Sequence, residues 1–268
     1  MVVIALAASH TPAAITNFSL TGTSYPQNFD GMTTSGTSTL PTGWGFTATS
    51  TTSGGDPANP TTATTVTSQD AGTSGTGVIT SVSAGGNYLY VNGVLATGTD
   101  KAIGILNSGT WTSPKGIIFG LTNNTGTTIT AFTLTWNDEK YRSGTRQWDW
   151  TTGFSTNGGT TYTATATGAQ TYAADANNST VSNPPTQIAK TVTITGLTLA
   201  NGSSFDLEWI LTGLLGSTNG QGLGIDDFTL SATLTAIPEP STWFAGGLTL
   251  FGLIATQRKR LFRLVKHS

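Results

Sequence analysis

Large apolar side chains alternate with hydroxyl side chains along Thr128–Trp136, and this pattern allows only one kind of regular structure. Phe132, Leu134 and Trp136 fall on one face of an extended chain, and threonines fill much of the other. Successive side chains of a β-strand point to opposite faces, so a period of two predicts a half-buried strand. The continuous apolar stretch Gly116–Leu121 predicts a second strand that is buried on both faces.

Similar segments, separated by turn residues, recur through residues 15–236. Helix formers are scarce and β-branched Thr and Val are abundant, which favours strands. About a dozen short strands with turn signals roughly every 8 to 12 residues indicate a sandwich or a jelly roll. We therefore expect an all-β, jelly-roll-like antiparallel β-sandwich in residues 15–236, with no helix before Trp243. The expected strands are Ile15–Leu20, Gln27–Met32, Leu40–Phe46, Tyr88–Val91, Ala102–Leu106, Gly116–Leu121, Thr128–Trp136, Trp148–Phe154, Thr160–Thr167, Thr191–Leu199, Phe205–Leu211 and Leu223–Leu234.

Three stretches are expected to be loops because they contain few large apolar side chains. Residues 47–77 are rich in Thr, Ser and Gly, residues 168–186 end in Pro184 and Pro185, and residues 216–224 are rich in glycine. Segments of this composition cannot bury enough apolar area to fold alone.

The composition excludes several classes of chemistry. Cysteine is absent, and the two histidines, His10 and His267, lie near the chain ends. The expected sandwich therefore cannot use thiolate chemistry, a Ser-His-Asp triad or zinc held by His or Cys. Residues 237–268 hold five of the eleven Lys and Arg and one of the thirteen Asp and Glu, which leaves the remainder with a net charge of about −6. An acidic body argues against nucleic acid as a partner, since that binding requires basic patches.

Residues 1–14 resemble the end of a secretory signal peptide. The apolar run Val2–Ala8 leads to small residues that suit signal peptidase, and we expect cleavage near Ala14. The segment has no basic residue before the apolar run, which indicates that translation starts further upstream. The alternative is that these residues form a first core strand.

Residues 237–268 consist of three consecutive parts. A rigid polar tetrapeptide is followed by an uncharged run, Thr242–Ala255, and then by a basic cluster. The tetrapeptide is Pro238, Glu239, Pro240 and Ser241. The uncharged run includes Thr242, Trp243, Phe244, Leu248, Leu250, Phe251, Leu253 and Ile254. The basic cluster holds Arg258, Lys259, Arg260, Arg263 and Lys266.

This order predicts a membrane anchor that follows the folded body. Prolines at alternate positions favour extended backbone, so the body is expected to end there. The uncharged run satisfies its backbone in lipid only as a helix, although its length of about 21 Å is short against a hydrocarbon core of roughly 30 Å. The basic cluster is expected on the cytoplasmic side of the inner membrane, by the positive-inside rule. The alternative is a C-terminal amphipathic or core helix of a soluble protein.

The three-part tail closely resembles the PEP-CTERM sorting domain. The resemblance rests on Pro-Glu-Pro with a following Ser, the short hydrophobic helix and the basic end, and it covers about one eighth of the chain. It implies that an exosortase processes the tail and that the mature protein reaches the cell surface or the medium of a bacterium that makes exopolysaccharide. Residues 123–228 more loosely resemble a bacterial extracellular β-sandwich module, through NNTGTTIT, FSTNGGTTY and GLGIDDFTL.

Five carboxylates are candidates for glycoside hydrolysis, which requires two acids on either side of the scissile bond. Asp138 and Glu139 are neighbours in one strand, so their side chains are expected to diverge. Glu208 is expected on the face opposite the aromatic core. The alternative is that all five are ordinary polar residues. The candidates are Asp138, Glu139, Glu208, Asp226 and Asp227.

Asp226 and Asp227 also suggest a structural calcium site. Neighbouring side chains in a strand point to opposite faces, so one aspartate should point inward, next to Ile225 or Phe228. A buried carboxylate needs a partner, which can be a cation, a backbone N–H or an arginine. Calcium binds carboxylate and carbonyl oxygens and needs neither His nor Cys. The closing strand resembles that of carbohydrate-binding jelly rolls, which implies that Asp30 is the matching acid.

Trp148 and Trp150 share a face of one expected strand and are candidates for contact with carbohydrate, since sugar rings stack on flat aromatic surfaces. The alternative is that both rings belong to the core. The resulting hypothesis is an exported, non-enzymatic β-sandwich that is a structural or interaction component associated with exopolysaccharide. A carbohydrate-binding module is the second hypothesis, and a glycoside hydrolase is the third.

Overall fold

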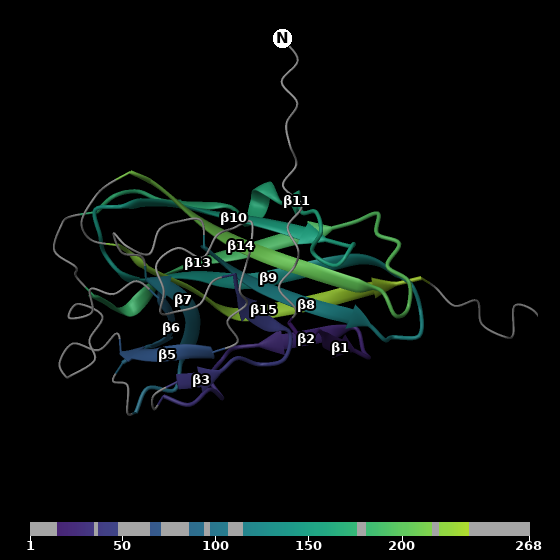
Figure 1. Ribbon diagram of the computed structural model, residues 1–268, viewed down its shortest axis with the longest axis horizontal. Helices are drawn as coiled ribbons and strands as arrows, with labels where there is room; N and C mark the ends of the chain where they lie inside the picture. Colours follow the sequence, from purple (N-terminus) through teal and green to yellow (C-terminus); the bar gives the residue numbers. More distant parts are fainter. Residues whose placement is uncertain are drawn as a thin grey trace, which may run out of the picture. The chain divides into compact units, whose positions relative to one another are not determined.

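The computed structural model describes residues 15–34, 37–47, 65–70, 86–93, 97–106, 115–175, 181–215 and 220–235. The chain divides into two units, Met1–Leu234 and Thr235–Ser268, and only Thr235 of the second is among the described residues. The first unit is an all-β, largely antiparallel sandwich (Figure 1). No α-helix occurs in the described residues, which confirms the expected fold class for this part of the chain.

One sheet, which we call sheet A, contains seven strands. Its central path runs β1-β8-β14-β10-β11, with β4 paired to β8 and β12 paired to β10. The strands are β1 Phe18–Leu20, β4 Trp44–Phe46, β8 Lys115–Asn123, β10 Gln147–Ser155, β11 Thr163–Ala164, β12 Gln170–Tyr172 and β14 Ser204–Leu215.

The other sheet, sheet B, contains eight strands. Its path runs β13-β9-β15-β7-β6-β5-β3, and β2 pairs with the second half of β15. The strands are β2 Ser24–Gln27, β3 Thr37–Thr39, β5 Thr65–Asp70, β6 Gly86–Val91, β7 Lys101–Leu106, β9 Ile129–Arg142, β13 Val181–Ile194 and β15 Gly222–Leu234.

The longer strands alternate between the two sheets in chain order, as expected for a jelly-roll-like chain path. β8, β10 and β14 belong to sheet A, and β9, β13 and β15 belong to sheet B. Two pairs, β1 with β8 and β5 with β6, are parallel and depart from the antiparallel rule.

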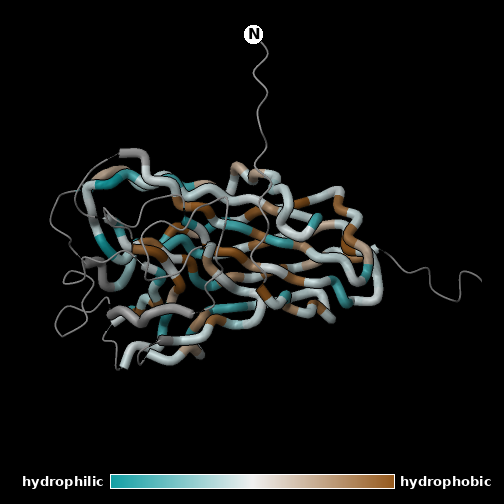
Figure 2. The backbone as a smooth tube through the Cα atoms, viewed as in Figure 1, coloured by the Kyte–Doolittle hydropathy of each residue, from teal (hydrophilic) through white to brown (hydrophobic). Residues whose placement is uncertain are grey.

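Aromatic side chains from both sheets meet in one core. Phe132 of β9 contacts Phe205 of β14 with ring centroids 4.5 Å apart, and Trp136 of β9 meets Trp209 of β14 edge to face at 5.5 Å. Trp44 of β4 stacks on Trp209 at 5.7 Å. Figure 2 shows hydrophobic residues recurring along the strands. The predicted inward face of β9 is confirmed, because Phe132, Leu134 and Trp136 are all buried.

Several predicted loops contain strands instead. β5 lies within the predicted loop 47–77, and β13 includes Pro184 and Pro185, where a loop was expected. The prolines are tolerated because the pairing register shifts between Val181 and Thr186, and because β13 is an edge strand that pairs with β9 in the described sheet. The reverse error occurs after Asn157, where the predicted strand Thr160–Thr167 contains only the short β11 and a 3₁₀ turn, Ala166–Gly168.

A β-bulge in β15 determines which residues the second half of this strand presents to each face. Asp226 pairs with Asn137, but Thr229, rather than Phe228, pairs with Thr135. Asp227 is the extra residue and has a φ of 49°, in the left-handed region that aspartate tolerates better than most side chains. The bulge keeps Phe228 in the core and places Thr229 on the outer face of sheet B.

Candidate functional site

The predicted sorting motif Pro238–Ser241, the hydrophobic run Thr242–Ala255 and the basic cluster from Arg258 lie outside the described residues, as does the expected signal remnant 1–14. No helix among the described residues is long and apolar enough to span a membrane. The tail therefore remains a prediction from sequence, and the sites described below belong to the sandwich.

The hypothesis that Trp148 and Trp150 stack on carbohydrate is wrong. The two rings do share a face of β10, but this face points into the core, and each side chain is only 1% exposed. Trp150 Nε1 donates a hydrogen bond to Asp138 Oδ1 at 3.1 Å, which fixes the ring further. Neither ring offers a surface to a sugar.

Asp30, Asp226 and Asp227 do not form the predicted calcium site. Among the described residues, no group of three or more His, Cys, Asp or Glu could hold a metal ion. Asp30 Oδ1 instead accepts a hydrogen bond from Lys101 N at 3.0 Å, and Asp227 Oδ2 accepts one from Asn137 Nδ2 at 3.1 Å. Asp30 and Asp227 are thus bonded to protein groups, and the calcium expectation is corrected.

Asp226 is the buried member of the aspartate pair, but it does not point toward the core beside Ile225 and Phe228 as expected: it pairs with Asn137, on the opposite face of sheet B. It is 1% exposed, and its Oδ1 has no hydrogen-bond partner in the described structure. Burial raises the pKa of Asp226 to about 10, the N–H of Asp227 partly opposes this rise, and the negative charge of Glu139 adds to it. The carboxyl group is therefore protonated at neutral pH.

Asp138 and Glu139 project to opposite faces of sheet B, as their adjacency predicted. Asp138 lies in the core, where Trp136 Nε1 donates to its Oδ1 at 2.8 Å, and burial raises its pKa to about 6. Glu139 accepts hydrogen bonds from Tyr141 Oη and from Gln187 Nε2, both at 2.5 Å. Burial raises the pKa of Glu139 to about 7. Both acids hold neighbouring side chains in place.

Glu208 shares the outer face of sheet A with Asp206, an acid that sequence reasoning had missed. The two residues are two apart in β14, so their side chains point the same way. Glu208 pairs with Gly153 of β10, and its Oε1 would lie 3.2 Å from a Cβ at that glycine. Burial raises the pKa of Asp206 to about 6 and that of Glu208 to about 7. Asp149 of β10, which lies between the inward-pointing Trp148 and Trp150, is a third acid on this outer face.

The outer face of sheet B carries two rows of hydroxyl side chains, which we call the threonine face. One row is Thr191, Thr135 and Thr229, and the next is Thr193, Thr133 and Ser231, on β13, β9 and β15 in each case. β2 extends the rows with Pro26 and Ser24. All of these side chains are exposed except Thr135, which is half-buried.

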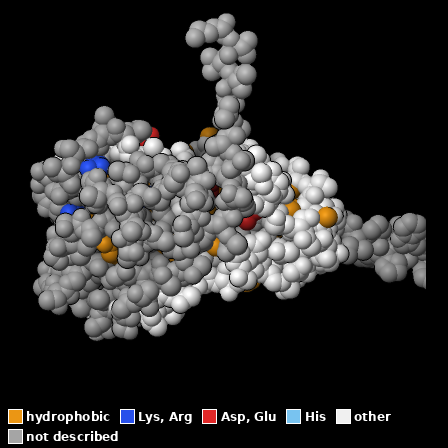
Figure 3. Space-filling model, in the orientation of Figure 1, with side chains coloured by type: hydrophobic (Ala, Val, Ile, Leu, Met, Phe, Trp, Pro, Cys, Tyr) orange, Lys and Arg blue, Asp and Glu red, His pale blue; other side chains and the backbone are white. Residues whose placement is uncertain are grey.

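The threonine face is a regular, uncharged array. Neighbouring strands lie about 4.8 Å apart, and successive outward residues of one strand lie about 7 Å apart. The array is internally bonded where Thr135 Oγ1 and Thr229 Oγ1 lie 2.6 Å apart. The part of the surface that Figure 3 draws in colours other than grey is likewise mostly uncharged. Alternating threonines were visible in the sequence, but their registration across three strands was not.

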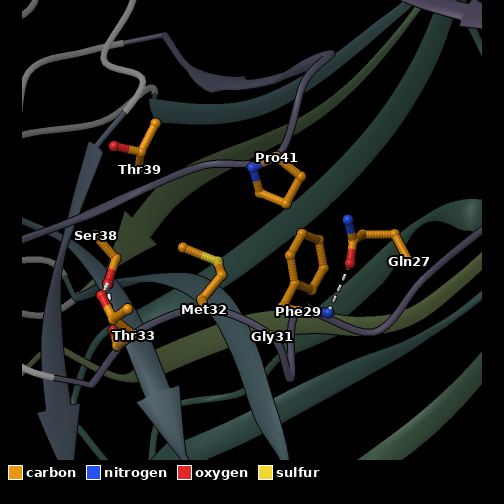
Figure 4. A pocket seen from close by; sticks show the side chains of 8 residues that line it. All are labelled: Gln27, Phe29, Gly31, Met32, Thr33, Ser38, Thr39 and Pro41. Carbon is orange, nitrogen blue, oxygen red and sulfur yellow. Dashed lines mark hydrogen bonds between the residues drawn. The ribbon is translucent and has the colours of Figure 1, made fainter.

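A pocket of about 450 Å³ lies where the β2–β3 connection meets β3 (Figure 4). Apolar side chains of Phe29, Met32 and Pro41 face the same space as polar side chains from β2, β3 and their connection. No lining residue is charged. The full lining is Gln27, Phe29, Gly31, Met32, Thr33, Ser38, Thr39 and Pro41.

Phe29 holds a strained conformation at this pocket. Its φ of 56° is rare for a bulky residue, and such a conformation costs on the order of 1–3 kcal/mol. Gln27 Oε1 accepts a hydrogen bond from Phe29 N at 3.0 Å, Met32 N donates to Phe29 O at 3.0 Å, and the ring meets Trp44 edge to face at 4.9 Å. The sequence predicted a strand through Gln27–Met32, which missed this turn.

No protein-family model and no curated protein matches the chain. Among solved structures, the CBM22-1 xylan-binding domain from Paenibacillus barcinonensis matches 79% of this chain and 95% of its own length at 10% identity and a TM-score of 0.36. A cleaved adhesin domain of Lys-gingipain from Porphyromonas gingivalis matches 77% of this chain and 98% of its own length at 10% identity and a TM-score of 0.40.

A third structure, modules of Clostridium thermocellum endo-1,4-beta-D-xylanase 10B complexed with xylohexaose, matches 78% of this chain at 7% identity and a TM-score of 0.34. This chain spans 28% of that protein's length. At such low identities and TM-scores, the similarities do not identify a ligand for this chain.

Proposed function

We propose that this chain is an exported structural component of an exopolysaccharide matrix, and that its sandwich adheres to neutral polysaccharide through the threonine face. The observation that carries the proposal is the arrangement of Thr191, Thr135 and Thr229 in one row and of Thr193, Thr133 and Ser231 in the next. The hydroxyls are exposed or half-exposed, and none of the six residues is charged.

The chemistry of the face suits a neutral, hydroxylated polymer. Each threonine hydroxyl both donates and accepts hydrogen bonds, as sugar hydroxyls do. A charged surface would lose hydration against a neutral polymer without gaining an ion pair, whereas a hydroxyl surface exchanges similar hydrogen bonds. Single contacts of this kind are weak, so useful adhesion depends on many contacts along one chain.

In this proposal, the C-terminal tail, residues 237–268, directs the export of the sandwich. The precursor is held in the inner membrane by the run Thr242–Ala255, with Arg258, Lys259 and Arg260 in the cytoplasm. An exosortase then cleaves near Pro240 and releases the sandwich to the cell surface or the medium. The support is the three-part tail itself, with its resemblance to the PEP-CTERM sorting domain.

The sorting step predicts a mature chain that ends close to Pro240 and lacks residues 258–268. Mass spectrometry of envelope and secreted fractions, from a bacterium that carries an exosortase, identifies the C-terminal residue of the mature chain directly. Glu239→Ala removes the only charge of the tetrapeptide and should leave the precursor in the inner membrane. Recovery of the unprocessed chain from the cell surface would contradict the sorting proposal.

Adhesion through uncharged groups predicts binding that salt does not weaken. The full-length chain should co-sediment with insoluble neutral polysaccharides, xylan and cellulose among them, and the bound fraction should stay the same between about 0.05 and 0.5 M NaCl. Loss of binding in the higher salt would mean that ionic contacts, and not the threonine face, hold the polymer.

We propose no catalytic role for the sandwich. Asp138 and Glu139 are bonded to indole, phenol and amide donors, and Asp206 and Glu208 are a pair of acids that share the outer face of sheet A. Hydrolysis of a bound polysaccharide that disappears with Glu208→Gln would favour a glycoside hydrolase instead.

A further inference from the structure

We propose that the pocket beside β3 binds one neutral sugar unit, such as the end or a branch of a polysaccharide chain. The inference rests on the proposed function and gives it a second, discrete contact. The pocket volume of about 450 Å³ falls in the range of small-molecule sites, about 300–1,000 Å³, and suits a single ring better than an extended polymer.

The lining combines the two kinds of surface that a sugar ring presents. Met32 and Pro41 offer apolar contact to the C–H faces of a ring, with the buried ring of Phe29 behind them, while the Gln27 amide and the Thr39 hydroxyl lie beside the same space. Among the described residues, Gln27 Nε2 makes a single long contact of 3.5 Å, to Tyr25 Oη, so it can donate a stronger hydrogen bond to a ligand. Because the lining carries no charge, the preferred ligand is neutral.

The pocket is preformed. Two hydrogen bonds inside the turn stabilise Phe29: its N–H donates to Gln27 Oε1, and its carbonyl accepts from Met32 N. Lys101 of β7 also ties the turn to sheet B. Its N–H donates a hydrogen bond to Asp30 Oδ1 at 3.0 Å, and its Nζ donates one to the Asp30 carbonyl. A strained turn that its surroundings hold in place is a recurrent feature of ligand sites. A ligand that enters such a pocket does not have to order the loop first.

Met32 provides a direct probe, because the chain contains only two methionines, Met1 and Met32. Full-length protein labelled with ¹³C at the methionine methyl groups should show at most two methyl signals. Met32→Leu assigns the pocket signal by removing it. The probes are the methyl glycosides of glucose, galactose, mannose and xylose, titrated in a phosphocholine detergent that contributes no sugar headgroup.

Gly31 and Gly22 supply a matched pair of variants. A Cβ at either glycine meets no atom within 4 Å, and both residues are exposed, but only Gly31 lines the pocket. Gly31→Leu should therefore fill the pocket without disturbing the fold, and Gly22→Leu adds the same side chain elsewhere. Melting temperatures that match the wild type would establish that both variants fold.

We expect at least one glycoside to shift the Met32 signal saturably, and we expect the apparent Kd to rise at least tenfold in Gly31→Leu but not in Gly22→Leu. If no glycoside shifts the signal, or if Gly31→Leu responds like the wild type, the pocket is not a sugar site. Co-sedimentation with polysaccharide that persists in that case would leave the proposed function standing. A Met32 response without co-sedimentation would uphold the pocket and overturn adhesion through the threonine face.

Discussion

Replacing Trp209 by alanine should lower the free energy of unfolding by about 3–5 kcal/mol, the usual cost of removing a buried aromatic ring. Trp209 is 1% exposed and lies between the sheets, where it stacks on Trp44 and meets Trp136 and Phe228 edge to face. Its Nε1 has no hydrogen-bond partner in the described structure, so the loss would come from packing. For a domain of this size the melting temperature should fall by roughly 10 °C.

Thr193→Ala provides the control for this core substitution. Thr193 is exposed on the outer face of sheet B, and surface substitutions of this kind usually change stability by less than about 0.5 kcal/mol. Chemical denaturation of both variants measures the difference. A loss below about 1 kcal/mol for Trp209→Ala would mean that the ring is not enclosed between two sheets.

Stability should fall as the pH rises, the reverse of ordinary acid denaturation. Burial raises the pKa of Asp138 and Asp206 to about 6, of Glu139 and Glu208 to about 7, and of Asp226 to about 10. Each raised value means that the folded chain binds a proton that the unfolded chain has released. The contributions are therefore complete below about pH 4 and are lost as the pH passes through each folded pKa.

Asp226→Asn isolates the largest of these effects. Above about pH 8 the four other carboxyls have mostly released their protons, so Asp226 should account for the remaining decline up to about pH 10, at about 1.4 kcal/mol per pH unit. Asparagine cannot release that proton, so the stability of the variant should be nearly constant between about pH 8 and 9, and the variant should be more stable than the wild type at pH 9.

Asp227→Asn makes the same substitution at the neighbouring exposed carboxylate, and this control should keep the decline. Urea unfolding at a series of pH values compares the three proteins. If the wild type were equally stable at pH 5 and pH 9, or if Asp226→Asn declined as steeply as the wild type, the carboxyl group would not be buried in its protonated form.

The inward face of each strand could be predicted where side chains alternate strictly. Phe132, Leu134 and Trp136 reach the core as their period of two requires. The same pattern placed Trp148 and Trp150 on one face of β10 but could not say which face, because a tryptophan suits both a core and a sugar platform. Only the position of β10 in sheet A decides that both rings point inward.

Other features depend on contacts between residues far apart in sequence. Pro184 and Pro185 argue for a loop locally, yet β13 includes them because it forms an edge of sheet B. The bulge at Asp227 shifts the pairing register between β15 and β9 by one residue, and no local sequence pattern predicts this shift. The pocket depends on a left-handed Phe29, which sequence preferences argue against.

The threonine face could be predicted only in part for the same reason. Each strand shows its alternating hydroxyls in the sequence, as in Thr191 and Thr193 or Thr133 and Thr135. Whether these residues lie side by side depends on the pairing of β13 with β9 and of β9 with β15, which brings together residues up to about a hundred positions apart. Sequence patterns describe each strand alone, whereas a surface for a polymer belongs to the sheet.

The most direct test of the proposed adhesion adds charge to the threonine face and measures retention on polysaccharide. Thr191→Asp/Thr229→Asp places two carboxylates in one row, on either side of Thr135. Thr151→Asp/Thr161→Asp adds the same charge at two exposed positions outside the face. With both variants folded, the first should lose at least tenfold in its apparent affinity for the polysaccharide that the full-length wild type co-sediments with, and the second should bind like the wild type. Equal retention of the two variants would contradict adhesion through the threonine face.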